Sequence, residues 1–560
     1  MLQRFAPVLL STALTVLPVI SQAEQGAGAY LAATIATRAG AFEAGARYFA
    51  EGLSESAHDA NLAQGAMVTR VAIGDVEGAL PYAEILVSLN PTDEFGVILM
   101  AAAAMQAGDF DAAVSQISDE ALAQNPIMRH LLAGWAMIGA GRFSDGIAQF
   151  GALDAINGLR GVARYHQALA NAYAGDFETA AKLFQDAGDA AYVSRTAILA
   201  HAEILAVLED YEGASLLMTR GLGARLNDVG AIELRRLVQA GAPITFTRIA
   251  DASDGAAEAA MLMAEALRND QAGRLALFYA RMAIFLKPGR DDAAVLTGDL
   301  LVDEAQPSLA LAAYGAVDAD APLALAALAG KVNVLESIGQ ADVAVDDLLA
   351  GIARFGEVPS LLNILGDVLR RSGRFGEAVE AYSRALAGIS NTDAPNIWSL
   401  YYMRGIALER DGRWEDAEKD LRKALNLAPD QAGLLNMLGY SLVDRGLALD
   451  EALGMIERAM ELRPDDGYIT DSLAWALYRL GRFEEAVDPM LAAVLLVPGD
   501  GILNDHYGDI LWMVGREREA VFQWNRALAS NAEDLDRNRI EDKLNRGLTA
   551  VLVDEQTSNE

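Results

Sequence analysis

The heptapeptide GRFGEAV at residues 373–379 returns three times further along the chain in closely related forms. These forms are GRWEDAE at 412–418, GRFEEAV at 481–487 and GREREAV at 515–521. In each of them an alanine stands five residues after the first glycine. Repetition of this kind predicts stacked copies of one structural unit rather than a single globular core.

A small residue in the same local pattern marks fourteen positions, most of them 33 to 35 residues apart. The positions are Gly45, Ala79, Ala113, Gly146, Ala180, Ala214, Ala276, Ala310, Ala344, Ala378, Ala417, Ala452, Ala486 and Ala520. The interval widens to 62 residues before Ala276 and to 39 before Ala417. Because a repeat array grows by contacts between neighbouring units, the 560 residues need not divide into several globular domains.

Each unit is predicted to consist of two antiparallel α-helices joined by a short turn. In the unit around Gly366, the apolar residues of 362–369 recur at helical spacing. Gly373 suits the turn, because glycine readily takes the positive φ of a helix end. Gly366 on the first helix and Ala378 on the second let the two helices approach closely. Tyr382, four residues later, is then expected to fill the gap beside them.

The period and the small–large pattern resemble those of the tetratricopeptide repeat (TPR), over roughly residues 27–530. The resemblance implies an all-α superhelical solenoid of about 14 helix–turn–helix units. Its units are degenerate in the block 24–226 and clear in the block 256–530. Residues 227–255 lack the pattern and are either a worn unit or a joint between two superhelical blocks. Residues 531–560 are expected to form a capping helix followed by an acidic, disordered tail from Asp554.

Residues 1–23 have the features of a secretory signal peptide. Arg4 precedes an apolar run at 8–20, and small residues allow cleavage after Ala23. The run is shorter than the roughly 20 residues of a membrane span. We therefore expect an exported protein with no transmembrane segment in the mature chain, although the sequence leaves open whether the signal is cleaved or retained as an anchor.

The composition excludes some classes of partner. The net charge of −34 argues against nucleic acid, since binding to phosphates requires Lys and Arg. Cysteine is absent, so the chain has no thiolate metal ligands and no cysteine to acylate. The five histidines have no metal-ligand spacing, and no phosphate-binding loop or nucleophile motif is present. We expect no cofactor, no metal and no enzymatic activity. The alternative is an enzyme hidden in 227–255, with Arg248, Asp251 and Asp254 as its reacting groups.

The candidate partner-binding surface follows from the TPR resemblance, which implies that the first helices line a concave groove. The residues expected to point into it are Asn363, Asp367, Arg370, Tyr402, Asn436, Tyr440, Asp471, Trp475, Tyr478, Asp505, Asp509 and Trp512. Aromatic rings interleaved with acids and amides suit an extended peptide. The alternative is that the aromatic residues pack between adjacent units.

Three runs resemble a more particular group of proteins. They are NMLGYSLVDRG at 436–446, DSLAWALYRLGR at 471–482 and DHYGDILWMVGR at 505–516. They resemble bacterial envelope TPR proteins that act as adaptors of carboxyl-terminal processing proteases in the turnover of cell-wall hydrolases. The resemblance implies a periplasmic scaffold with protein partners. Those adaptors are typically lipoproteins, whereas this chain has no cysteine. A holdase or assembly scaffold for exported material is the alternative, and homo-oligomerisation stays open.

Overall fold

The computed structural model describes residues 27–222, 229–270, 272–389, 396–530, 532 and 535–558. The expected signal peptide at 1–23 lies outside the described residues. The part that is described contains 31 α-helices and no strand, which confirms the predicted all-α solenoid. The chain forms two compact units, Met1–Arg354 and Phe355–Glu560. The expected joint at 227–255 therefore lies inside the first unit.

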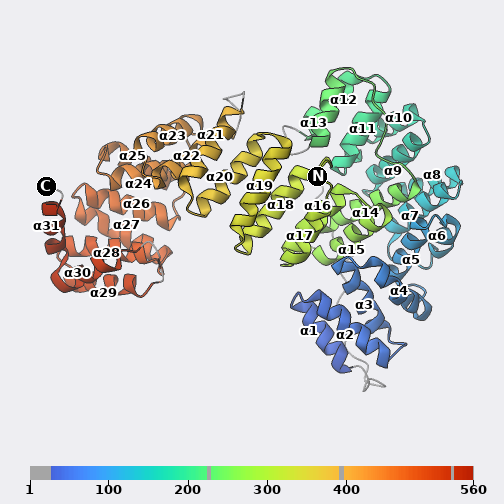
Figure 1. The fold of residues 1–560 in the computed structure, drawn as a ribbon, viewed down its shortest axis with the longest axis horizontal. Helices are drawn as coiled ribbons and strands as arrows, with labels where there is room; N and C mark the ends of the chain where they lie inside the picture. Colours follow the sequence, from blue (N-terminus) through green and yellow to red (C-terminus); the bar gives the residue numbers. More distant parts are fainter. Residues whose placement is uncertain are drawn as a thin grey trace. The chain divides into compact units, whose positions relative to one another are not determined.

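Most helices of the first unit pack in consecutive pairs (Figure 1). The pairs are α1 (Ala27–Arg38) with α2 (Phe42–Glu55), α3 (Ala60–Ile73) with α4 (Val76–Leu89), α5 (Glu94–Gln106) with α6 (Phe110–Gln116), α7 (Pro126–Gly139) with α8 (Phe143–Ala152), α9 (Arg160–Tyr173) with α10 (Phe177–Ala187) and α11 (Arg195–Val207) with α12 (Tyr211–Leu222). After the single helix α13 (Val229–Gln239) come α14 (Ala252–Asn269) with α15 (Gly273–Leu286), α16 (Asp291–Asp303) with α17 (Pro307–Gly315) and α18 (Ala324–Ser337) with α19 (Ala341–Phe355).

The second unit continues the same arrangement and ends in two further helices. Its pairs are α20 (Pro359–Arg371) with α21 (Phe375–Ala387), α22 (Ile397–Arg410) with α23 (Trp414–Leu427), α24 (Ala432–Asp444) with α25 (Leu449–Leu462), α26 (Gly467–Arg479) with α27 (Phe483–Leu496) and α28 (Gly501–Met513) with α29 (Glu517–Leu528). The last helices are α30 (Arg537–Arg546) and α31 (Leu548–Ser558). The prediction that the chain is disordered from Asp554 is therefore wrong for residues 554–558, because α31 extends to Ser558.

The recurring small residue is the fourth residue of the second helix in all fourteen pairs. The twelve alanines among them are 0% exposed, and Gly45 and Gly146 are also buried. The side chain at this position faces the first helix of its own pair, where a longer one would separate the two backbones. The recurring small residue therefore marks the place where the two helices of a pair pack closely, as predicted.

The turn glycines also behave as predicted. Gly373, Gly412, Gly481 and Gly515 have φ values between 74° and 80°. This left-handed conformation is costly for residues with a Cβ atom, so glycine is the natural residue at the end of each first helix.

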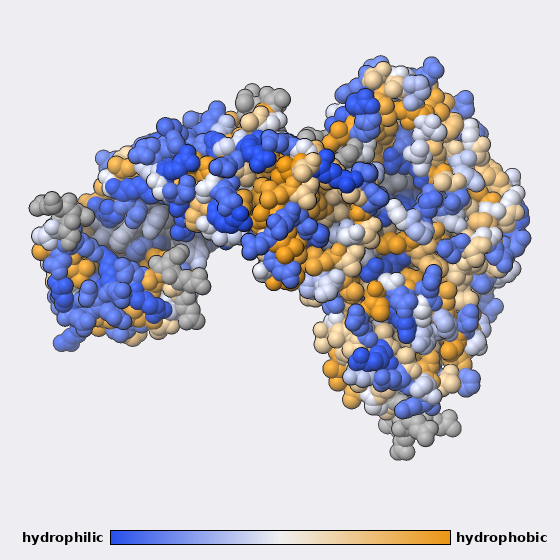
Figure 2. Space-filling model, viewed as in Figure 1, coloured by the Kyte–Doolittle hydropathy of each residue, from blue (hydrophilic) through white to orange (hydrophobic). Residues whose placement is uncertain are grey.

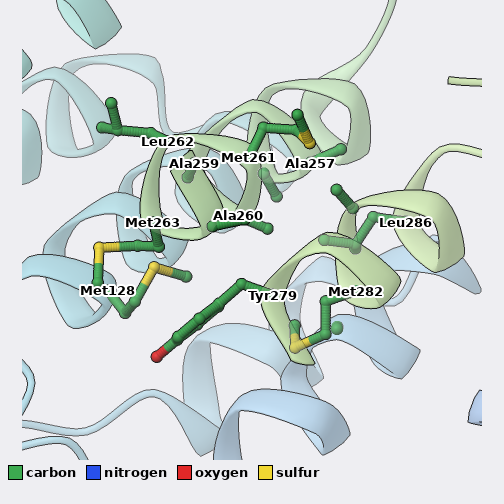
Figure 3. Close-up of a cluster of buried hydrophobic side chains, with 14 of the residues drawn as sticks. Met128, Ala257, Ala259, Ala260, Met261, Leu262, Met263, Tyr279, Met282 and Leu286 are labelled. Carbon is green, nitrogen blue, oxygen red and sulfur yellow. The ribbon is translucent and has the colours of Figure 1, made fainter. Parts of the chain in front are cut away.

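The irregular stretch does not form a complete helix pair. It consists of the single helix α13 and a non-helical segment at 240–251, after which the chain turns back. Helices α14 and α15 then pack against α3, α5 and α7, which are first helices of much earlier pairs. Figure 3 shows the buried apolar side chains of this contact, including Met128 of α7, Met263 of α14 and Tyr279 of α15.

Candidate functional site

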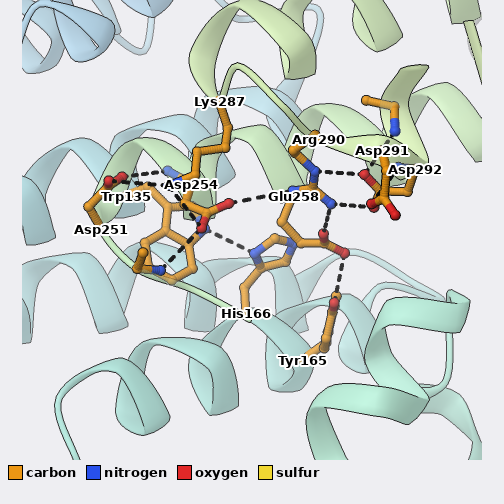
Figure 4. Close-up of polar contacts among 12 residues, drawn as sticks. Trp135, Tyr165, His166, Asp251, Asp254, Glu258, Lys287, Arg290, Asp291 and Asp292 are labelled. Atoms are coloured by element: carbon orange, nitrogen blue, oxygen red, sulfur yellow. Dashed lines mark hydrogen bonds and ion pairs between the residues drawn. The ribbon is translucent and has the colours of Figure 1, made fainter. Parts of the chain in front are cut away.

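In the first unit, the chain itself covers the side of α5, α7 and α9 against which α14 and α15 pack. The ring of Trp135 lies against Gly255 of α14, and Trp135 Nε1 donates to His166 Nδ1 at 3.0 Å (Figure 4). Tyr165 Oη donates to Glu258 of α14 at 2.7 Å. These buried contacts leave no room for a partner on this part of the first helices.

A cluster of ion pairs closes the same contact. Arg290 Nη2 lies 2.7 Å from Glu258 and 2.6 Å from Asp292 (Figure 4). Asp254 accepts a hydrogen bond from the backbone N–H of Ala250 at 3.1 Å and lies 3.6 Å from Lys287. The buried groups of α14 therefore have partners within the protein.

The three residues of the alternative enzyme hypothesis all have structural contacts. Arg248 Nε donates to the buried carboxylate of Glu203 at 2.7 Å. The Asp251 side chain caps the start of α14 by accepting from the N–H of Asp254 at 2.8 Å. These contacts hold the chain where it turns back, and they give the three residues a structural role.

The predicted groove residues of the second unit lie on its first helices. Two of them, Asp367 and Asp509, bond to an aromatic side chain of the second helix in the same pair. Tyr382 Oη of α21 donates to Asp367 of α20 at 2.7 Å. Trp524 Nε1 of α29 donates to Asp509 of α28 at 2.9 Å, and Asp509 is 0% exposed. Each aspartate follows a glycine that lies beneath the aromatic ring. The prediction that Asp509 points into a groove is therefore wrong, whereas Asp367 stays partly exposed, 3.8 Å from Arg370.

Other predicted groove residues contact the next unit along the array. His506 Nδ1 lies 2.9 Å from the buried carboxylate of Asp471. Lys543 of α30, which is 0% exposed, lies 2.9 Å from Asp505 and 2.7 Å from Asp509. An acid on the first helix thus binds a cation on the following first helix. These contacts correct the expected exposure of Asp471 and Asp505.

The last two helices cover the C-terminal end of the predicted row. Trp512 Nε1 donates to Thr549 Oγ1 of α31 at 3.1 Å, and the ring of Trp512 lies against Gly547. Tyr478 is buried and stacks on Trp475 with ring centroids 4.7 Å apart. Trp512 and Tyr478 are therefore packing residues, as the alternative interpretation of the aromatic row expects. Trp475 also stacks on His506, with ring centroids 3.9 Å apart, so part of its ring is occupied by packing.

Apart from Asp367, which bonds to Tyr382, six of the predicted residues remain half-buried and are not engaged by the last two helices. We call them the open row: Asn363, Arg370, Tyr402, Asn436, Tyr440 and Trp475. Three polar atoms of the open row are buried without a hydrogen-bond partner, namely Arg370 Nε, Asn436 Oδ1 and Trp475 Nε1. Such an atom costs about 1–3 kcal/mol when it is left unsatisfied. All three atoms are enclosed by neighbouring side chains, so a ligand reaches them only if those side chains move.

The two tyrosines of the open row keep their protons over the physiological range. Burial raises the pKa of Tyr402, against an opposing effect of Arg370. Burial also raises the pKa of Tyr440, and the nearby carboxylates of Asp471 and Asp444 raise it further. Both phenols are thus neutral groups that can donate a hydrogen bond and cover an apolar surface.

The second helices of this unit have a different character. On the face drawn in Figure 2, hydrophilic residues predominate over α21, α23 and α25. An ion pair between Arg422 and Glu451 at 2.7 Å links the successive second helices α23 and α25, and Arg458 of α25 pairs with Asp430 of the turn after α23 at 2.9 Å. Charged side chains paired in this way form a solvated surface. The contrast favours the first helices as the candidate site.

The sequence analysis missed the cations that hold the buried acids. His506 stands 35 residues after Asp471, and Lys543 stands 38 residues after Asp505. The spacing of about one period was the available signal, because the same point on successive first helices recurs at this interval. Lys543 was hidden because α30 lies beyond the last clear repeat.

Neither a metal-binding cluster nor a membrane-spanning helix is found among the described residues. In the described ranges, no three His, Asp or Glu side chains converge to hold a metal ion. None of the helices that are described combines the length and the apolar character needed to cross a membrane.

Comparison with known proteins agrees with the repeat geometry. Tetratricopeptide-repeat family models match residues 357–430 and 436–501. A TPR repeat-containing protein of Pseudomonas aeruginosa is 32% identical over 150 residues, covering 21% of this chain and 25% of the relative. The match thus spans only a quarter of that relative's length. With its fourteen helix pairs and these matches, the chain is a tetratricopeptide-repeat protein.

The chain also matches solved structures, among them the following two. A tetratricopeptide repeat protein from Parabacteroides merdae has 16% identity and a TM-score of 0.37, covering 45% of this chain and 96% of its own. A chain of the APC/C hetero-tetramer Cut9–Hcn1 has 14% identity and a TM-score of 0.34, covering 81% of this chain and 96% of its own.

Proposed function

We propose that the chain binds a partner protein by holding an extended peptide segment of it across the open row of the second unit. The TPR architecture itself supports a scaffold for protein–protein interaction. The observation that carries the proposal is the row of half-buried polar and aromatic side chains on α20, α22, α24 and α26. They lie on first helices, and the corresponding side of α5, α7 and α9 is already filled by α14 and α15.

An extended peptide would meet the needs of this surface. Its backbone carbonyls can accept from the guanidinium of Arg370 and the phenols of Tyr402 and Tyr440, and its N–H groups can donate to the side-chain carbonyl of Asn363. The rings of Tyr402 and Tyr440 offer apolar faces for the alternate side chains of the peptide. Buried aromatic and arginine side chains of this kind often carry most of the binding energy at an interface.

The test is a selection of binding peptides from a random display library on the full chain. Affinities of the selected peptides are then measured by fluorescence anisotropy with Asn436→Leu and Tyr440→Leu. Each variant is expected to weaken binding about tenfold, which corresponds to about 1.4 kcal/mol. Asn436→Leu should not lower the stability of the chain, because it removes a polar atom that has no partner.

The matched control is Phe522→Ala, which removes a 62% exposed aromatic ring from α29. The control variant should bind the peptides as the wild type does. Equal affinities for the wild type and both open-row variants, or a loss confined to Phe522→Ala, would contradict the proposal.

We further propose that the scaffold acts in the bacterial envelope as an adaptor of a carboxyl-terminal processing protease. Support comes from the three C-terminal runs that resemble such adaptors and from the export features of residues 1–23. A purified protease should then cleave a cell-wall hydrolase faster in the presence of the chain, since an adaptor raises the local concentration of the substrate. No change in the cleavage rate would refute this role. Weak binding to many unfolded clients would favour a holdase instead.

A further inference from the structure

A pocket in the first unit contains a half-buried arginine that makes no ion pair with any described residue. The pocket has a volume of about 220 Å³ and lies between the end of α3, α15 and α17. Arg281 of α15 lines it, and no carboxylate in the described part of the chain lies within ion-pair distance of this side chain. The guanidinium lies against Gly74, at the end of α3, and Nη2 donates to the Ala72 carbonyl at 3.4 Å.

The surroundings of Arg281 leave most of its donors unused. Its Nε is buried and has no hydrogen-bond partner. Burial lowers the pKa of Arg281 to about 10, so the side chain still carries its charge at neutral pH. A buried charge without a counter-ion is costly, and natural proteins usually pair it. In a chain with 78 acidic and 44 basic residues, the missing counter-ion is conspicuous.

The other charged groups of the pocket are already satisfied. Arg290 pairs with Glu258 and Asp292. Asp291 accepts hydrogen bonds from the N–H groups of Asp292 at 3.0 Å and Leu323 at 2.9 Å. Arg281 is therefore the group of this pocket that still lacks an anion.

The remaining walls of the pocket are apolar. They include Ile73 of α3, Ile284 of α15, and Leu309 and Ala313 of α17. We propose that this pocket binds a carboxylate that carries a short aliphatic group, with the carboxylate on Arg281 and the aliphatic group against these walls. The planar guanidinium matches a carboxylate. A phosphate dianion would bring a second negative charge close to Asp291.

Two sources can supply this chemistry: a free short-chain carboxylic acid, or the C-terminal residue of a polypeptide. Calorimetric titration of the full chain with hexanoate and with hexanamide tests the first source. A peptide ending in leucine, with a free or an amidated C-terminus, tests the second. The carboxylate form of at least one pair should bind at least tenfold more tightly than its amide, and the pair that shows the difference identifies the source.

Two variants test the place of binding. Arg281→Met removes the charge, and Ala312→Phe puts a ring on an exposed residue that lines the pocket. Both variants should abolish the preference for the carboxylate. The control is Arg274→Met, because Arg274 lies on α15 like Arg281 but is paired with Glu304; this variant should keep the preference. Without ligand, Arg281→Met should melt no lower than the wild type, because the lost charge was unpaired. Equal binding of acids and amides by the wild type, or an acid preference that survives both variants, would overturn the proposal.

Discussion

The closeness of the paired helices predicts that one substitution, glycine to alanine, has opposite effects at two helical positions of the second unit. A Cβ atom at Gly366 of α20 would lie 2.6 to 2.8 Å from three ring carbons of Tyr382. Carbon atoms normally pack at about 3.5–4.0 Å, and Tyr382 is 0% exposed with its hydroxyl bonded to Asp367, so the ring cannot move freely. Gly454 of α25 is exposed and has no atom within 4 Å of the added methyl group.

The magnitudes follow from these contacts. Overpacking of a close-packed interior costs about 1–3 kcal/mol. Alanine is favoured over glycine within a helix by about 1 kcal/mol, which offsets part of this cost. Gly366→Ala should therefore destabilise the α20–α21 pair by up to about 2 kcal/mol. Gly454→Ala lacks the clash and should stabilise α25 by up to about 1 kcal/mol.

Native-state hydrogen exchange is the suitable assay, because a repeat array opens locally and a single melting temperature would average over many units. The amides of α20 and α21 should exchange faster in Gly366→Ala, and those of α25 more slowly in Gly454→Ala. Replacing Tyr382 with leucine in the Gly366→Ala background should restore part of the lost protection. Slower exchange in α20 and α21 of Gly366→Ala would refute the close-packing argument.

Three further predictions concern the buried charged groups. Burial lowers the pKa of His166 to about 3 and that of His201 to about 4, so the unfolded chain binds more protons below pH 6.5. The free energy of unfolding of the first unit should thus fall by about 2 kcal/mol for each histidine as the pH falls to 5. Hydrogen exchange of the amides in α9 and α11 measures this, and exchange there that does not respond to acid would contradict it. Lys543→Met removes the buried cation that Asp505 and Asp509 share and should cost about 3–5 kcal/mol, seen as rapid proteolysis within α30 and α31, whereas unchanged resistance would argue against the ion cluster. Arg248→Ala should leave the buried carboxylate of Glu203 without its cation and loosen 240–251 in exchange experiments, with unaltered exchange as the contrary result.

The repeat units could be predicted from the sequence because their contacts are local. The small residue of each second helix meets the first helix of its own pair, and the glycine between them ends that first helix. Both contacts span fewer residues than one period, so each copy of the pattern carries the same information. Even the degenerate units, such as that of Ala113, keep this residue fully buried.

The return of α14 and α15 onto earlier helices could not be predicted in the same way. The hydrogen bond from Asn125 Nδ2 to Tyr279 Oη joins residues 154 positions apart. Such a contact belongs to no period, and the apolar faces of α14 read equally well as those of an ordinary repeat helix. The absence of the pattern at 227–255 indicated an irregularity but not where the chain goes afterwards.

The candidate site was predicted in part. Asp367 and Asp509 stand on first helices, as expected, but each follows the glycine beneath an aromatic ring and bonds to that ring's polar atom. Helical spacing alone does not distinguish positions that bond to the paired second helix from neighbouring positions that face solvent. Asp471 was misplaced for another reason, since its partner His506 lies on the next first helix.

Photo-crosslinking tests the central claim most directly. A selected peptide that carries a benzophenone group is bound to the full chain and irradiated, and the attachment sites are read by mass spectrometry. We expect the crosslinks on α20, α22, α24 and α26, at or beside Tyr402, Tyr440 and Trp475. Crosslinks confined to the second helices α21, α23, α25 and α27, or to the first unit, would contradict the account.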